Sequence, residues 1–251
     1  MTGPTPRFVV HPDKQVLADA VAARLVTALV DAQSEREIAE LVLTGGSMGA
    51  ATVAALARIP ARAAVDWSRV QVWWGDERYL PSGNPDRNCT QCDDAGLMEL
   101  GLDPALVHRV PGPDTSESTE DSAERYAATV RDHGTGPFDV VLLGVGPDAH
   151  VASLFPHHPA QTAGGTITVP VHDSPKPPAD RVSLTFDALM RARQVWFLVS
   201  GAEKADAVAA AAAPGADRWD VPAAGVRGTD ATLWLLDLAA AAALPGGTAG
   251  P

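Results

Sequence analysis

An acid and an imidazole stand two residues apart after an apolar run in the middle of the chain. Residues 140–143 are apolar and rich in β-branched side chains; Gly144 and Gly146 follow, and then Asp148 and His150. A buried parallel strand that ends in a glycine turn lies where open α/β sheets bind their ligands. A carboxylate beside a histidine at such an edge suits proton transfer near neutral pH. The spacing predicts a catalytic His150 oriented by Asp148.

Two other interpretations of this segment stay open. Gly144, Gly146 and Ala149 fit the dinucleotide fingerprint G-x-G-x-x-[GA]. Asp148 speaks against it, because a carboxylate would stand where a pyrophosphate should sit. Alternatively, His150 is a residue at a helix start that Asp148 holds for structural reasons alone.

A second glycine turn, T-G-G-S-M-G at 44–49, joins another apolar run to a helical one. Glycines at such a junction let backbone N–H groups approach an anion, and the helix dipole favours negative charge there. Gly45, Gly46 and Ser47 are therefore candidate anion ligands. The turn also matches the nucleophile-elbow pattern G-x-S-x-G. An elbow normally follows several strands, however, and only one strand and one helix are expected before the strand that leads into this turn. A tight turn without function is the third possibility.

Three charged residues, Asp76, Glu77 and Arg78, directly follow the apolar run 70–74. Charges at the end of a buried strand are costly unless they pair or serve a function. One interpretation is a structural ion pair of Arg78 with Asp76 or Glu77. The other is that Asp76 and Arg78 hold a substrate.

Two further cations stand where strands meet loops. Lys204, in S-G-A-E-K-A, falls at the start of a helical segment, where the helix dipole disfavours positive charge. Residues that contradict local sequence preferences often stand at functional positions, although a solvated surface lysine is the simpler explanation. Arg181 begins a β-like run, R-V-S-L-T. With Ser47, these cations could form an anion site, Arg as a planar fork and Lys as a point charge.

Strand-like and Ala-rich helical runs alternate along the chain, which indicates a mainly parallel sheet covered by helices on both faces. The fold class is therefore α/β, a three-layer, doubly wound sheet in one domain. The strands are expected at 8–10, 41–44, 70–74, 140–143 and 194–200, and the helices at 13–33, 49–57, 120–131 and from 201 to 213. Residues 231–237 are expected to form a last strand or a junction between a strand and a helix. We expect the domain to span 7–240, with flexible tails at 1–6 and 241–251. The Pro- and Gly-rich stretch 161–180 is a candidate lid.

Composition excludes several functions. The formal net charge of −12 argues against nucleic-acid binding. No apolar run approaches the roughly 18 residues of a membrane span, and the N-terminus lacks a signal pattern, so a cytoplasmic location is expected. The two cysteines, Cys89 and Cys92, are expected to be ordinary reduced thiols. With the dispersed histidines they form no three-ligand set, so we expect no metal and no cofactor.

Taken together, the motifs closely resemble those of the 6-phosphogluconolactonase family. T-G-G-S, W-G-D-E-R, G-V-G-P-D-x-H-V-A-S-L-F-P, R-V-S-L-T and S-G-x-x-K-A occur in this order between 44 and 205. That family shares its fold with glucosamine-6-phosphate deaminase and the sugar-phosphate isomerases. The resemblance implies hydrolysis of 6-phosphogluconolactone in the oxidative pentose phosphate pathway, with the phosphorylated sugar lactone as the binding partner. We expect the protein to be a monomer.

The resemblance also implies roles for individual residues. His150 corresponds to the family's general base, and the Gly-Ser turn, Arg181 and Lys204 to its phosphate ligands. Ala149 and Arg87 depart from the pattern, which has glycine and serine there. If the glycine takes positive φ, Ala149 costs about 1 kcal/mol. We expect Asp148 to raise the pKa of His150 slightly, because a close carboxylate favours imidazolium.

Three alternatives remain for the function. A related deaminase or isomerase would use Asp76 to move a carbon-bound proton. A serine esterase would use Ser47 as its nucleophile. A sensor would keep the phosphate site without turnover.

Overall fold

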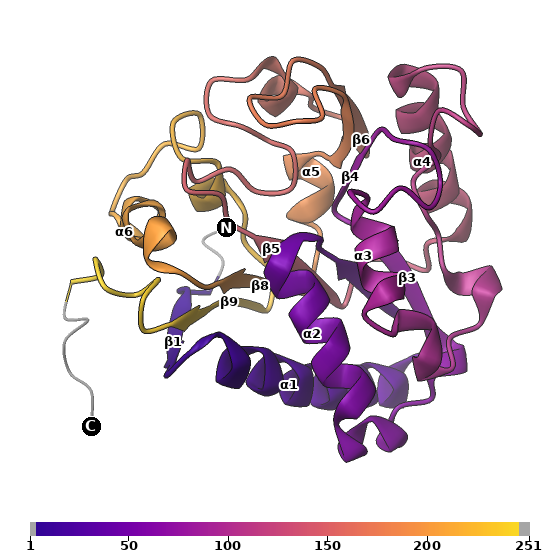
Figure 1. The fold of residues 1–251 in the computed structure, drawn as a ribbon, viewed down its shortest axis with the longest axis horizontal. Helices are drawn as coiled ribbons and strands as arrows, with labels where there is room; N and C mark the ends of the chain where they lie inside the picture. Colours follow the sequence, from indigo (N-terminus) through magenta and orange to yellow (C-terminus); the bar gives the residue numbers. More distant parts are fainter. Residues whose placement is uncertain (1–3, 246–251) are drawn as a thin grey trace.

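A six-stranded parallel sheet forms the centre of the computed structural model, which describes residues 4–245 (Figure 1). Its strands are β1 (Arg7–His11), β2 (Ala39–Leu43), β3 (Val70–Trp74), β5 (Val140–Gly144), β8 (Gln194–Val199) and β9 (Ala231–Asp237), in the order β1-β9-β8-β5-β2-β3. Every neighbouring pair is parallel. The strand expected at 70–74 has these bounds in the structure, and residues 231–237 form a strand over their whole length.

The direction of the winding reverses between β2 and β5. From β2 the chain continues to β3 at one edge, whereas from β5 it proceeds through β8 and β9 toward the other edge. Loops on the two sides of such a reversal diverge and leave a crevice at the carboxyl ends of the strands. The segments 44–49 and 145–150 both begin there.

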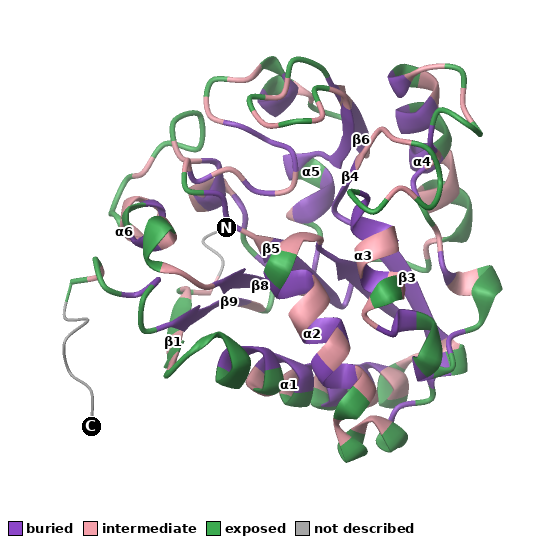
Figure 2. Ribbon diagram, viewed as in Figure 1, coloured by how far each residue is buried: buried purple, intermediate pink, exposed green. Residues whose placement is uncertain are grey.

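Helices cover both faces of the sheet, as expected for the three-layer class. Alternate residues of each strand enter different cores: Leu41 and Leu43 pack with α1, α2 and α3, whereas Val42 packs with α4, α5 and α6. In Figure 2 the strands are almost entirely buried, with the exception of the edge strand β1, and the helices expose their outer faces. The helices are α1 (Lys14–Glu35), α2 (Gly46–Arg58), α3 (Asn88–Asp94), α4 (Thr119–His133), α5 (Phe186–Leu189) and α6 (Ala205–Ala212).

A second, three-stranded antiparallel sheet was not predicted. It consists of β4 (Asp76–Arg78), β6 (Thr168–Val171) and β7 (Arg181–Leu184), in the order β4-β7-β6. The stretch 161–180, predicted to be a long loop, therefore contains a strand. The pairing sets Arg78 opposite Arg181, so two segments more than 100 residues apart bring their charged side chains to one place.

The core extends beyond the expected end of the domain at residue 240. Ala240 and Ala241 are buried, and Leu244 packs against the same core, so the boundary at 240 was too early. Residues 1–3 and 246–251 of the expected tails lie outside the described residues. Within the part of the chain that the structure describes, no helix is long and apolar enough to cross a membrane.

Candidate active site

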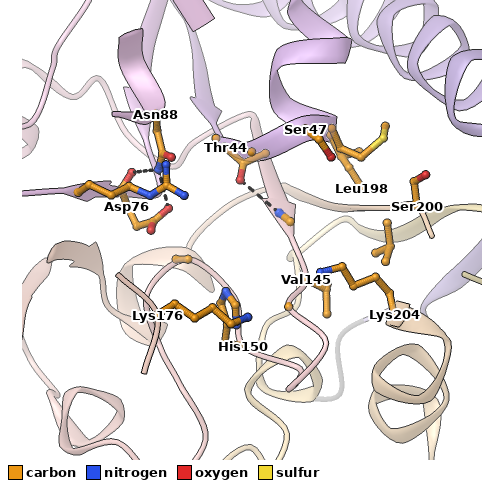
Figure 3. A pocket seen from close by; sticks show the side chains of 18 of the residues that line it. Thr44, Ser47, Asp76, Asn88, Val145, His150, Lys176, Leu198, Ser200 and Lys204 are labelled. Atoms are coloured by element: carbon orange, nitrogen blue, oxygen red, sulfur yellow. Dashed lines mark hydrogen bonds between the residues drawn. The ribbon is translucent and has the colours of Figure 1, made fainter. Parts of the chain in front are cut away.

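A cavity of about 360 Å³ opens at the carboxyl ends of β2, β5 and β8, on the crevice between the diverging loops (Figure 3). Strand β4 and the segment 172–180 close its other sides. All the candidate residues except Asp148 line this cavity: Gly45, Gly46, Ser47, Asp76, Arg78, His150, Arg181 and Lys204. The parallel sheet and the small antiparallel sheet together thus collect residues spread over 160 positions into one site.

In the turn after β5, His150 and Asp148 are joined by a hydrogen bond. The Nδ1 atom of His150 lies 2.5 Å from Oδ1 of Asp148, and the Gly146 N–H donates to the His150 carbonyl at 3.0 Å. A carboxylate can only accept, so Nδ1 carries the proton and Nε2 keeps its lone pair. A Cβ on Gly146 would lie 2.0 Å from His150 Nδ1. Position 146 therefore requires glycine, because any side chain there would collide with the hydrogen-bonded pair of Asp148 and His150.

Burial decides the protonation of this pair. The side chain of His150 is 16% exposed and packs on the Phe155 ring with centroids 4.5 Å apart. Burial lowers the pKa of His150 below its usual value, although Asp148 acts in the opposite direction. Our expectation that the carboxylate would prevail was wrong, because the imidazole is more deeply buried than a site open to water suggested.

Asp148 itself stays ionised. Burial alone would raise its pKa, but the hydrogen bond from His150 and the charges of His150 and Lys176 hold the pKa of Asp148 well below its usual range. A carboxylate is thus present at neutral pH to orient the imidazole.

The turn after β2 presents backbone groups instead. Gly46 has φ +73°, with open space where a Cβ would point, whereas a Cβ on Gly45 would collide with Asn88. Helix α2 begins directly at this turn, and Ser47 is exposed in its first turn. The first N–H groups of a helix have no intrahelical partner, so this end of the cavity suits an anion.

Ser47 is not arranged as an esterase nucleophile. Figure 3 shows Ser47 across the cavity from His150, on the side of Lys204. Among the described residues no hydrogen bond joins the Ser47 hydroxyl to a histidine. A serine nucleophile needs a base within hydrogen-bond reach.

The other end of the cavity is organised around Asp76. Its Oδ1 accepts a bond from Asn88 Nδ2 at 3.1 Å and its Oδ2 one from the Ser153 hydroxyl at 2.6 Å. Nη1 of Arg181 lies 4.0 Å from Oδ2. Asn88 also contacts Gly45, so Asp76 is fixed relative to the anion-binding turn. Asn88 and Ser153 were not among the predicted site residues.

Neither ion pair considered for Arg78 is formed. Glu77 instead accepts bonds from the backbone N–H groups of Asn88 and Cys89, at 2.7 and 2.9 Å, where α3 begins. Arg78 donates to the carbonyl of Asp86. Glu77 is therefore a helix cap, whereas Arg78 lines the cavity.

Arg181 and Lys204 enter the cavity from different elements. Two nitrogens of Arg181 are used by the neighbouring loop: Nη2 donates to the carbonyls of Lys176 and Pro177, both at 3.0 Å, and Nε donates to that of Pro178 at 3.3 Å. Lys204 ends the short 3-10 helix Ala202–Lys204 that precedes α6. Burial and the charge of Lys176 lower the pKa of Lys204. Ser47 and Lys204 thus lie on one side of the cavity, whereas Arg181 lies next to Asp76.

Lys176 is a site residue that the sequence did not identify. Its Nζ lies 3.3 Å from Oδ1 of Asp148, and its side chain lines the cavity. The chain has only three lysines, Lys14, Lys176 and Lys204, so a lysine within the S-P-K-P-P segment was a signal that could have been used.

The two departures from the family motif are accommodated differently. Ala149 is buried and has φ 64°, which is the condition under which we expected the replacement of glycine to carry a cost. Arg87 is buried, pairs with Glu77 at 3.6 Å and donates to the Leu80 carbonyl at 3.0 Å. Arg87 therefore ties the loops around α3 together.

The two cysteines lie beneath the site. Both are buried and free, and burial raises the pKa of Cys89 to about 11 and that of Cys92 to about 12. Neither is a thiolate at neutral pH. Over residues 4–245, no three His, Cys, Asp or Glu side chains are placed to share a metal ion.

Comparison with known proteins places this cavity in a family. The profile of the glucosamine-6-phosphate isomerases/6-phosphogluconolactonase family matches residues 12–234. The 6-phosphogluconolactonase of Streptomyces coelicolor is 51% identical, over 96% of this chain and 95% of that protein. That of Mycobacterium tuberculosis is 44% identical, over 94% and 97%. The chain belongs to this family.

The solved structures agree with the fold. The 6-phosphogluconolactonase of Trypanosoma brucei superposes with a TM-score of 0.81 at 27% identity, covering 96% of this chain and 99% of that one. The 6-phosphogluconolactonase of Thermotoga maritima gives 0.80 at 26% identity, covering 93% and 100%. The similarity to 6-phosphogluconolactonases thus holds in both sequence and structure.

Proposed function

We propose that the protein is a 6-phosphogluconolactonase, which opens 6-phospho-D-glucono-1,5-lactone to 6-phosphogluconate in the oxidative pentose phosphate pathway. The observation that carries this proposal is the Asp148–His150 pair, whose imidazole lines a cavity ringed by cations in a protein of net charge −12. A neutral base and a local positive field are what an anionic ester substrate requires.

The reaction needs one base. Nε2 of His150 takes a proton from water as the water oxygen attacks C1 of the lactone. The tetrahedral intermediate then collapses, the bond between C1 and the ring oxygen breaks, and the imidazolium returns the proton to that oxygen. Asp148 holds the imidazole by Nδ1 throughout and stabilises its charged form.

The phosphate binds at the α2 end of the cavity. The exposed Ser47 hydroxyl and the N–H groups of the first turn of α2 donate to it, apart from the Gly46 N–H, which is bonded to Gln91 Oε1 at 3.0 Å, and Lys204 supplies charge from the same side of the cavity. Nη1 of Arg181 adds a donor from the side of Asp76. Binding energy at this remote group holds C1 against the water, which lowers the barrier without contact to the reacting atoms.

Asp76 and Arg78 contact the sugar hydroxyls in this proposal. Asp76 already accepts bonds from Asn88 and Ser153, so its carboxylate is held as a fixed acceptor. A carbon base in an isomerase would need to approach C2 with a free lone pair. The deaminase or isomerase reaction is therefore the second candidate, supported by the same fold.

The test is a pH-stat or coupled assay on freshly generated 6-phosphogluconolactone, corrected for spontaneous hydrolysis. We expect turnover of this lactone well above the blank and none of glucosamine 6-phosphate. Turnover of glucosamine 6-phosphate alone would establish the isomerase-type reaction. Binding of 6-phosphogluconate without turnover of either compound would identify a sensor.

A further inference from the structure

Lys176 is the one cation that bonds to the catalytic pair among the residues the structure describes. Its Nζ lies 3.3 Å from Oδ1 of Asp148 and 3.3 Å from Nδ1 of His150. Both nitrogens carry protons, so the ammonium and the imidazole are two donors that share one carboxylate oxygen. Figure 3 shows the Lys176 side chain beside the His150 ring at the floor of the cavity.

The loop that carries Lys176 is fixed by its backbone. Arg181, itself 4% exposed, donates through Nη2 to the carbonyls of Lys176 and Pro177. The Ser174 hydroxyl donates to the Lys176 carbonyl at 2.9 Å. The backbone of Lys176 is therefore anchored from two sides, and its side chain reaches Asp148 from a defined position.

We propose that Lys176 is a positioning residue of the lactonase, which keeps His150 neutral by sharing the carboxylate oxygen of Asp148. The ammonium partly neutralises Asp148, and this reduces the stabilisation that the carboxylate offers to an imidazolium. His150 then remains a base at a lower pH than Asp148 alone would allow. This inference rests on the proposed function, because it assigns His150 the role of base.

Other charged groups also face His150. Asp76 approaches from β4 and favours imidazolium, whereas Arg181 from β7 lies over the Phe155 ring and near Asp76. Lys204 lines the cavity from the segment before α6. None of these three groups is hydrogen-bonded to Asp148, so only Lys176 acts through the carboxylate that orients the base.

The first experiment titrates the His150 ring by NMR in the free protein, assigned with His150→Gln. Lys176→Met should raise the pKa of His150 by about one unit, since an opposing charge is lost. Asp148→Asn should shift it in the opposite direction. Lys176→Arg should restore a value close to that of the wild type, and the exposed Lys14→Met, which removes the same charge from the start of α1, should leave it unchanged.

The second experiment measures kcat/KM of the same variants between pH 5 and 8. For Lys176→Met we expect kcat/KM to fall several-fold near pH 5.5 and to reach the wild-type value near pH 8. A His150 pKa raised by about one unit moves only the acidic limb of the pH profile. Lys204→Met should instead raise KM without moving the limb.

Two results would overturn the proposal. One is an unchanged His150 titration in Lys176→Met while the melting temperature stays that of the wild type. The other is an equal loss of kcat/KM at every pH, which would mean that Lys176 contacts the substrate directly. The proposed function fails separately: a wild type without lactonase activity refutes it, whereas the ring titration still reports whether Lys176 controls His150.

Discussion

The turns after β2 and β5 lie side by side, joined by a bond from the Gly144 N–H to the Thr44 hydroxyl at 3.3 Å, yet they use glycine for different purposes. Gly46 adopts φ +73° with open space where a Cβ would point, so no side chain stands between the cavity and the start of α2. Gly146 does not have a positive φ. Glycine is needed at this position because the side chains of His150 and Asp148 occupy the volume that a Cβ would take. The turn at 44–49, here the open turn, can bind an anion through its backbone. The turn at 145–150, here the crowded turn, fixes a base by close packing of its side chains.

The largest expected effect is on the crowded turn. His150→Ala should lower kcat by about 10²–10⁴, the usual loss on removal of a general base. Affinity for 6-phosphogluconate, measured by calorimetry, should stay close to that of the wild type because the α2 end of the cavity is untouched. A variant that keeps more than half of the wild-type kcat would show that another group is the base.

Gly146→Ala tests the role of crowding directly. The new Cβ would lie 2.0 Å from His150 Nδ1 and 2.4 Å from Asp148 Oδ1, so the pair must separate. A displacement of about 1 Å costs on the order of 10² in rate. Gly164→Ala is the matched control, since its Cβ would meet only Asp187 Oδ2 at 3.8 Å. Equal kcat in the two variants would refute the requirement for glycine at 146.

The open turn should respond in binding rather than in rate. Lys204→Met should weaken 6-phosphogluconate binding by about tenfold to a hundredfold, as expected for a lost hydrogen bond to a charged group of about 1.5–3 kcal/mol. Ser47→Ala should have a smaller effect of the same kind and retain measurable kcat. Calorimetry with gluconate, which lacks the phosphate, provides the control. If both variants bind 6-phosphogluconate like the wild type, the phosphate lies elsewhere.

The smallest effect is expected at Ala149, in the same crowded turn. Ala149→Gly relieves the strain of φ 64°, worth roughly 1–2 kcal/mol. It also loses a buried methyl group and adds backbone entropy to the unfolded chain, about 0.8 and 0.5–1 kcal/mol. The free energy of unfolding in urea should therefore stay within about 1 kcal/mol of the wild type. A larger loss would show that the Ala149 methyl group is a packing element.

Periodicity sufficed for the main sheet because its strands, apart from the exposed edge strand β1, are largely apolar and buried on both faces. Residues 70–74 and 231–237 were therefore predicted with their observed bounds. The second sheet escaped prediction for local reasons. Strand β4 has three residues, all charged, and β6 contains Pro170. Both segments form strands because they pair with β7, and this pairing cannot be predicted from the residues of either segment alone.

The sequence by itself determined the parallel sheet, the glycine turns at the ends of its strands and the pairing of an acid with His150, because these depend on neighbouring residues. The tertiary structure decided what surrounds them. Only the folded chain shows that burial outweighs Asp148 in setting the pKa of His150, and only there does Lys176 reach Asp148. The burial of a side chain and the charge around it depend on residues that are distant in sequence. Only tertiary packing brings those residues together.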